Sequence, residues 1–197
     1  MKLLEYIRKS KLYYPPKNIV LYRGVSNPKI LFVGENPDKE ENLKGIPFLG
    51  KSGKMLDSWI REYRLQKYVG MIYAIPLIPL NVFGGVRNPY LDEIDYFRPY
   101  VEYMVEKLQP KIIICVGNTA CRSVLKSNVG SMRHHLTKKG KYFYTAVYHP
   151  TYYLRKGLNG LEDFKNTYIE ISAVLENLPQ IKIEPSEKAD IDKILKN

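Results

Sequence analysis

Residues 29–38, with the sequence KILFVGENPD, combine a short apolar run with a polar loop. The run Lys29–Val33 ends at Gly34, a pattern typical of a buried strand that opens into a loop. Four strands of this kind are indicated along the chain, and apolar residues at helical spacing lie between them. The predicted strands are 29–33, 71–75, 111–116 and 142–147, and the predicted helices are 52–64, 91–108, 118–125 and 161–178.

Strands that alternate with helices predict βαβ units with right-handed crossovers. The expected fold is therefore α/β, a three-layer α/β/α arrangement around a central four-stranded parallel sheet. Ser52 is the expected N-cap of the helix after the first strand. We expect one domain over residues 1–183, followed by a polar extension over residues 184–197. Ligands of such sheets bind beyond the carboxyl ends of the strands, so the loops after the strands are the places to search.

Composition excludes several classes of protein. Hydrophobic residues make up 45% of the 197 residues, too many for a disordered chain. No apolar run reaches the ~18 residues of a membrane span, and the amino-terminal residues lack a secretory signal, so we expect an intracellular protein away from membranes. The two cysteines, Cys115 and Cys121, cannot form a disulfide scaffold and have no paired zinc ligands nearby, so no metal is expected.

The formal charge of +11 has two explanations. One is solubility or a general compositional bias, and the other is a polyanionic partner, nucleic acid first. The run Arg133–Lys141 holds Arg133, Lys138 and Lys139 without any acid, and we expect it to contact DNA phosphates. Charge by itself does not choose between the two explanations.

Five motifs in order carry a resemblance to a known family. They are GENPDKEEN (34–42), GIPFLGKSGKMLD (45–57), LQPKIIICVGNTACRSVL (108–125), VGSMRHHL (129–136) and YHPTYYLR (148–155). With them the chain resembles the uracil-DNA glycosylase superfamily, and family 4 most closely. The resemblance implies a monofunctional DNA glycosylase of base excision repair, acting as a monomer. Such an enzyme flips a deaminated base, uracil first, out of DNA and hydrolyses its N-glycosidic bond.

Three residues are the expected catalytic group. Glu35 and Asn36 are the candidates for handling water, with their division of labour open, because a carboxylate can act as a base whereas an amide can only orient water. An alternative for Asn36 is that it caps the turn before Pro37. His149 is the expected donor to the departing base, where negative charge develops.

The remaining candidates bind the base or the DNA. Phe48, in a tight loop, is expected to stack on the base, unless it is an ordinary core residue, and Pro37 is expected to line the same site. Tyr153 and Leu154 are the expected wedges for the gap that an extruded nucleotide leaves, and Arg155 is expected to bind a phosphate. The alternative for the tyrosines is packing on a helix.

Two departures from family 4 stand out. That family carries an iron–sulfur cluster on four cysteines, near the amino terminus and after the second strand, and neither region contains cysteine here. No cofactor is therefore expected. The family also has an asparagine after the second strand that binds the uracil edge, whereas here an apolar residue follows Tyr73, and Asn81 is the nearest substitute. Alternatives are an enzyme for another deaminated base, such as hypoxanthine or xanthine, or an inactive DNA-binding or partner-binding module of the same fold.

Overall fold

The computed structural model describes residues 2–15, 17–176 and 178. The predicted domain boundary at residue 183 and the predicted extension 184–197 lie outside them. Among the described residues, every helix is too short or too polar to cross a lipid bilayer.

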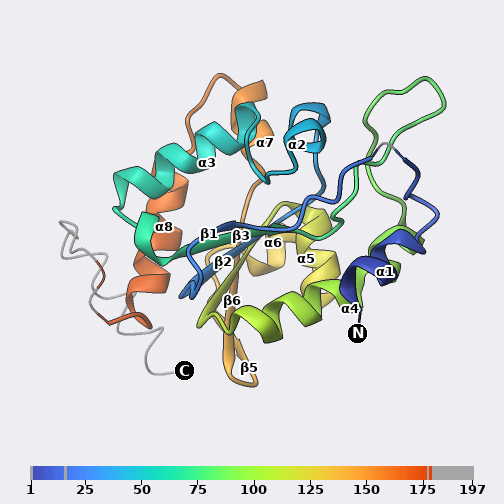
Figure 1. The fold of residues 1–197 in the computed structure, drawn as a ribbon. Coiled ribbons are helices and arrows are strands. Elements are labelled where there is room, and N and C mark those ends of the chain that lie inside the picture. Colours follow the sequence, from blue (N-terminus) through green and yellow to red (C-terminus); the bar gives the residue numbers. More distant parts are fainter. Residues whose placement is uncertain (1, 16, 177, 179–197) are drawn as a thin grey trace.

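The centre of the molecule is a six-stranded sheet with the strand order β1-β3-β2-β4-β6-β5 (Figure 1). Its four inner strands are parallel, which confirms the predicted parallel core. Both edge strands are antiparallel to their neighbours and were not predicted, because β1 is only two residues long and β5 is polar and exposed. The strands are β1 Arg23–Gly24, β2 Ile30–Gly34, β3 Val69–Tyr73, β4 Ile112–Val116, β5 Thr137–Lys139 and β6 Tyr142–Val147.

Helices cover both faces of this sheet, so the three predicted layers are confirmed (Figure 1). Alternate residues of β2 show why its sequence is continuously apolar. Ile30 and Phe32 lie in the core formed with α3 and α8, whereas Leu31 and Val33 lie in the core formed with α4 and α5. The helices are α1 Leu3–Arg8, α2 Lys39–Lys44, α3 Lys51–Glu62, α4 Leu91–Leu108, α5 Asn118–Leu125, α6 Val129–Met132, α7 Pro150–Arg155 and α8 Leu161–Ser172, with a 3-10 turn η1 at Gln66–Tyr68.

The start of α3 corrects one sequence prediction. The helix begins at Lys51 and its N-cap is Gly50, not Ser52. A side chain at position 50 does not fit, because a Cβ there would lie 2.4 Å from Oδ2 of Asp38. The carboxyl end of α8 differs too, since it lies at Ser172 rather than at Leu178.

Glu170 of α8 is a buried carboxyl group that the sequence did not single out. It is 4% exposed, and the hydroxyl of Thr145 donates a hydrogen bond of 2.7 Å to its Oε2. Burial raises the pKa of Glu170 to about 7. At neutral pH the group is therefore held close to its point of protonation inside the folded protein.

We predict that Glu170→Gln stabilises the protein at pH 8 and leaves it unchanged at pH 4. The folded-state pKa is raised, so between pH 4.5 and 7 the native state binds more protons than the unfolded state, and stability falls as pH rises. Removing the charge should raise the free energy of unfolding at pH 8 by on the order of 1–3 kcal/mol. Urea unfolding at both pH values measures the difference. The control is Glu162→Gln on the exposed side of α8, and an equal effect of Glu170→Gln at both pH values would contradict the prediction.

Candidate active site at the carboxyl edge of the sheet

Three polar side chains meet where three neighbouring parallel strands end. Glu35 follows β2, Thr119 lies in the first turn of α5 after β4, and His149 follows β6. The hydroxyl of Thr119 donates a hydrogen bond of 2.5 Å to Oε1 of Glu35. The sequence predicted Glu35 and His149 but not Thr119, although its place in the first turn after the third predicted strand could have indicated it.

His149 is the N-cap of α7, and this position determines which ring nitrogen carries the proton. Its Nδ1 accepts a hydrogen bond from the backbone N–H of Thr151 at 3.4 Å and lies 2.8 Å from the Thr151 hydroxyl. A nitrogen that accepts cannot also be protonated, so the proton of the neutral ring is on Nε2. Burial lowers the pKa of His149 below its ordinary value, although the negative charge of Glu35 opposes that shift. The ring is therefore a neutral donor.

Asn36 and Pro37 continue the loop after Glu35. The side-chain amide of Asn36 donates a hydrogen bond of 3.0 Å to the carbonyl of Pro37, so one of its two N–H groups is used within the turn. Asn36 is half-buried and Pro37 is buried. This contact leaves the Asn36 oxygen and the second N–H available for water.

Phe48 lies below the end of β2 with its ring in the core. It is 1% exposed and stacks on Tyr73, with 4.8 Å between ring centroids. The close approach requires glycine at position 34, because a Cβ there would lie 2.4 Å from Cζ of Phe48. Phe48 itself has a φ of 57°, an uncommon conformation for a bulky residue. The ring is thus a fixed part of the floor beneath the site rather than an open platform.

Several polar contacts hold the backbone of Phe48 in this conformation. Its N–H donates to the Tyr73 hydroxyl at 2.9 Å, and its carbonyl accepts from Arg23 at 2.7 Å. Arg23 also pairs with Asp57 of α3 at 2.8 Å. Buried Glu41 accepts from the N–H of the next residue, Leu49, at 3.0 Å. Burial raises the pKa values of both Glu41 and Tyr73.

The structure buries Tyr153, predicted as a wedge, and pairs Arg133, predicted as a DNA contact, with a carboxylate. Tyr153 is buried edge-on against Trp59, and its hydroxyl donates to Asp163. Arg133 pairs with the same carboxylate and lies over the ring of Tyr148, 4.6 Å from its centroid. Both residues therefore stabilise the segment around His149 from inside. Leu154, which is 41% exposed, and Arg155 lie on the outer side of α7 instead.

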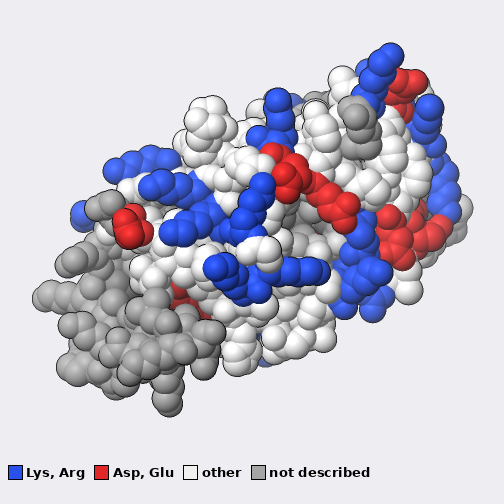
Figure 2. All heavy atoms as spheres, turned by 90° about the horizontal axis from the view of Figure 1, so that it is seen from below, with Lys and Arg blue, Asp and Glu red and all other residues white. Residues whose placement is uncertain are grey.

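Lys138 and Lys139 lie beside the amino-terminal end of β6, whereas His149 follows the carboxyl-terminal end of that strand. Both belong to β5, in which Lys139 pairs with Tyr142 at the start of β6. At about 3.3 Å per residue, the length of β6 separates that point from the carboxyl end by about 16 Å. The predicted phosphate track through these lysines therefore does not adjoin the site. Lys and Arg side chains gather on the face seen from below in Figure 2.

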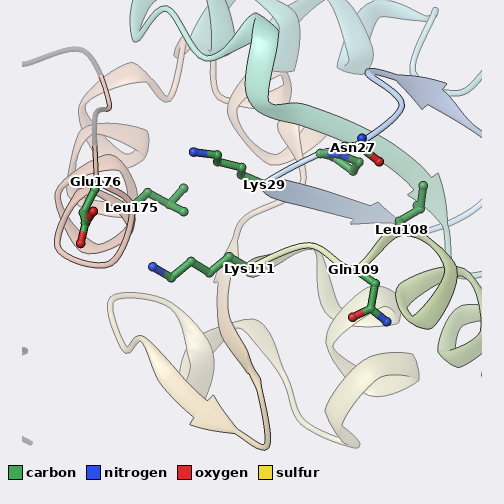
Figure 3. Close-up of a pocket in the computed structure, with 8 residues that line it drawn as sticks. Asn27, Lys29, Leu108, Gln109, Lys111, Leu175 and Glu176 are labelled. Carbon is green, nitrogen blue, oxygen red and sulfur yellow. The ribbon is translucent and has the colours of Figure 1, made fainter.

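A cavity of about 560 Å³ lies at the amino ends of the parallel strands (Figure 3). Lys29 and Lys111, which directly precede β2 and β4, line one side, and Leu175 and Glu176 line the other. Nζ of Lys111 donates a hydrogen bond of 2.6 Å to the carbonyl of Val174. Because it lies at the amino ends of the strands, this cavity is separate from the candidate active site.

Asn81 does not lie with the other base-binding candidates. It is exposed, and its Oδ1 accepts hydrogen bonds of 2.9 Å from the N–H groups of both Phe83 and Gly85. The residue that directly follows β3 is Ala74, which is fully buried. The residue that directly follows β3 therefore provides no side-chain amide.

The residues present do not fit an iron–sulfur cluster. Cys115 of β4 and Cys121 of α5 are buried and hydrogen-bonded to each other, away from the amino-terminal segment and the loop after β3. Burial and the Cys121 contact raise the pKa of the Cys115 thiol, which disfavours the thiolate that a metal requires. Within the described residues, no group of three or more acidic, histidine or cysteine side chains is arranged to hold a metal ion.

A buried lysine joins the two segments where family 4 holds its cluster. Nζ of Lys17 donates hydrogen bonds of 2.9 Å to the carbonyl of Leu12 in the amino-terminal segment and to that of Ile78 after β3. It also lies 4.1 Å from the ring centroid of Tyr14. The Lys17 ammonium thus links these segments without a metal.

We predict that Lys17→Met lowers the free energy of unfolding by about 2–3 kcal/mol, because two buried carbonyls lose a charged donor. Urea unfolding measures the loss, and amide exchange should show faster opening around Leu12 and Ile78. Lys9→Met is the matched control, since the Lys9 side chain is 73% exposed. Equal stability of Lys17→Met and the wild type would contradict this role.

Comparison with known proteins identifies the family. The sequence model of the Uracil DNA glycosylase superfamily matches residues 22–172. The chain is 31% identical over 174 residues to a Type-4 uracil-DNA glycosylase of Sulfurisphaera tokodaii, covering 80% of this chain and 77% of the relative. It is 30% identical over 154 residues to that of Saccharolobus solfataricus, covering 74% and 69%. The relative from Archaeoglobus fulgidus is 29% identical over 154 residues, covering 73% and 75%. With the parallel sheet and the residues at its carboxyl edge, these matches show that the chain belongs to the uracil-DNA glycosylase superfamily.

Proposed function

We propose that this chain is a monofunctional DNA glycosylase that removes uracil from DNA as the first step of base excision repair, acting as a monomer. The observation that carries the proposal is a carboxylate, Glu35 after β2, on the same edge as a neutral histidine donor, His149 after β6, with only β4 between the two strands. The Type-4 uracil-DNA glycosylases that the chain resembles support the choice of uracil.

The proposed chemistry assigns a separate task to each group. The bond between C1′ of the deoxyribose and N1 of uracil breaks, and uracil leaves with the bonding electrons. Nε2–H of His149 donates to the uracil O2, where negative charge develops. Glu35, oriented by Thr119, accepts a proton from the water whose oxygen bonds to C1′. The oxygen of Asn36 orients that water, and the proton held by Glu35 then passes to the uracil anion, so the products are uracil and an abasic site.

Other residues are proposed to hold the extruded nucleotide and the DNA. Pro37 and the fixed ring of Phe48 form the floor beneath the base. Leu154 is proposed to fill the gap in the duplex, because its exposed side chain stands on the helix that begins at His149. Arg155, exposed at the end of the same helix, is proposed to bind a phosphate.

The test is incubation of the pure protein with an oligonucleotide that contains one uracil, followed by alkaline cleavage of abasic sites. We expect strand cleavage at the uracil and none in the same oligonucleotide with thymine. No cleavage with any deaminated base, together with salt-sensitive DNA binding, would instead support a non-catalytic DNA-binding module.

Ala74 favours a second candidate, an enzyme that accepts other deaminated bases. A site that hydrogen-bonds a base edge with an amide rejects bases that do not match it, and that discrimination is lost where the amide is absent. Ala74 is buried at the end of β3 and provides no amide. Oligonucleotides containing hypoxanthine and xanthine, assayed in parallel with uracil, measure the preference. Release of uracil alone would contradict this candidate.

A further inference from the structure

The loop after β3 carries the most exposed large apolar side chains of the described residues. Val82 and Phe83 are each 93% exposed. A single exposed apolar residue is ordinary, but two adjacent ones at a loop tip are typical of a contact surface. The proposed site and chemistry above leave both side chains unused.

The turn that presents Phe83 is built by hydrogen bonds. Oδ1 of Asn81 accepts from the N–H groups of Phe83 and Gly85 at 2.9 Å each, and the N–H of Asn81 donates to the Gly85 carbonyl at 2.8 Å. Leu80 and Val86 pair as an antiparallel bridge below the turn. Asn81, predicted as a base contact, therefore holds the loop in shape.

The stem of the loop is attached firmly to the rest of the protein. Nζ of Lys17 binds the carbonyl of Ile78 at 2.9 Å, and the N–H of Arg87 donates to the carbonyl of Pro79 at 3.1 Å. Arg87 also forms a two-pronged ion pair with buried Glu93 of α4, with N–O distances of 2.8 and 2.6 Å. These contacts hold both segments of the stem, so the loop tip extends from a rigid base. A rigid base limits the conformational entropy that the loop loses on binding.

The loop leaves the sheet beside the candidate catalytic carboxylate. β3 is the neighbour of β2, and the N–H of Ile75 donates a hydrogen bond of 3.1 Å to the carbonyl of Glu35. Figure 1 shows the loop, in green, extending on the same upper side of the molecule as α2 and α7. The loop that carries Phe83 follows β3 and the helix that carries Leu154 follows β6, and the end of β2, where Glu35 lies, is between these two strands.

A cleft between this loop and α2 adds positive charge. It has a volume of about 290 Å³ and is lined by Tyr14, Lys17, Lys39, Asn42, Ile78 and Leu80. Lys39 is exposed and suits a phosphate at this cleft, whereas the Lys17 ammonium is buried and bound to the carbonyls of Leu12 and Ile78. Phosphates and bases alternate along a DNA strand. An aromatic side chain at the loop tip suits contact with a base, and the cationic cleft suits contact with a neighbouring phosphate.

We propose that Phe83 stacks on a base of the DNA next to the excised nucleotide, with Val82 covering the edge of that base. Gly84 and Gly85 follow directly and leave room for the DNA to approach. The proposal rests on the proposed function only in taking DNA as the substrate, and it assigns Phe83 to binding rather than to bond cleavage.

The test measures binding of DNA without uracil by fluorescence anisotropy. Phe83→Ala should bind about tenfold more weakly than the wild type, which is about 1.4 kcal/mol. Phe83→Trp should retain binding, and stacking should quench the fluorescence of the introduced indole when DNA is added. The one native tryptophan, Trp59, is 1% exposed, so it provides a constant background. The matched control is Leu91→Ala, an exposed apolar residue of α4 outside the loop, with wild-type affinity expected.

Uracil excision measured in parallel separates this inference from the proposed function. Weaker binding by Phe83→Ala and quenching in the Phe83→Trp variant support the inference whether or not uracil is released. If the wild type releases uracil while Phe83→Ala binds DNA normally and the Phe83→Trp variant shows no quenching, the inference is overturned and the proposed function stands. If the wild type binds no DNA, both are overturned.

Discussion

Replacing His149 by alanine is expected to lower kcat for uracil release by about 10²- to 10³-fold, the usual cost of losing one donor to a developing oxyanion. The loss should lie in kcat rather than in KM, because the negative charge on the base appears only in the transition state. Single-turnover release of uracil from a labelled oligonucleotide measures it.

The pH profile gives a second check on His149. Because burial lowers the pKa of His149 below its ordinary value, the ring is mainly neutral at pH 7 and above and gains charge only at lower pH. Activity should therefore show no loss from His149 between pH 7 and 8.5. Thr151→Val is the control for positioning, since it removes the hydroxyl next to Nδ1 but keeps the backbone N–H. A His149→Ala enzyme with wild-type kcat would remove His149 from the mechanism.

Replacing Glu35 by glutamine is expected to lower kcat by about 10²- to 10⁴-fold, the range for a general base. Glutamine keeps the size of the side chain and can still accept the hydrogen bond from Thr119, but it cannot take a proton from water. Asn36→Ala should cost about tenfold, or about 1.4 kcal/mol, because an amide only orients the water.

The division of labour between Glu35 and Asn36 is decided by comparing these variants. Thr119→Val keeps the carboxylate but removes its 2.5 Å hydrogen bond, and should reduce kcat less than Glu35→Gln does. Urea unfolding of each variant controls for loss of fold. A near-normal rate in Glu35→Gln with a large loss in Asn36→Ala would reverse the two assignments.

Local patterns were sufficient to predict the inner strands, α4 and the place of the site. Three inner strands lie within one residue of their predicted bounds, but β3 spans Val69–Tyr73 instead of 71–75, because apolar residues continue past its end. The helix α4 begins and ends at its predicted residues, Leu91 and Leu108. Residues such as Glu35 and His149 follow strands directly, so the parallel order alone places them at one edge. Helices of less than two turns, such as α2 and α7, carry too few residues to show a helical period.

Contacts between distant residues were not predictable in this way. Arg133 belongs to a basic run in the sequence, yet its partner is Asp163, thirty residues later, which offsets its positive charge. Tyr153 pairs with the same carboxylate. Lys138 and Lys139 precede His149 closely in the chain, but the antiparallel pairing of β5 with β6 carries them to the opposite edge of the sheet.

The order of apolar and polar segments thus determined the α/β fold and brought Glu35 and His149 to one edge, and the five motifs carried the resemblance to the family. The tertiary structure alone decided which cations are paired and which nitrogen of His149 carries the proton. It also decided that Phe83 is exposed while Phe48 is buried. The physical reason is that the periodicity of strands and helices depends on residues that are close together in the sequence. Burial, ion pairing and tautomer depend instead on partners that only the folded chain brings together.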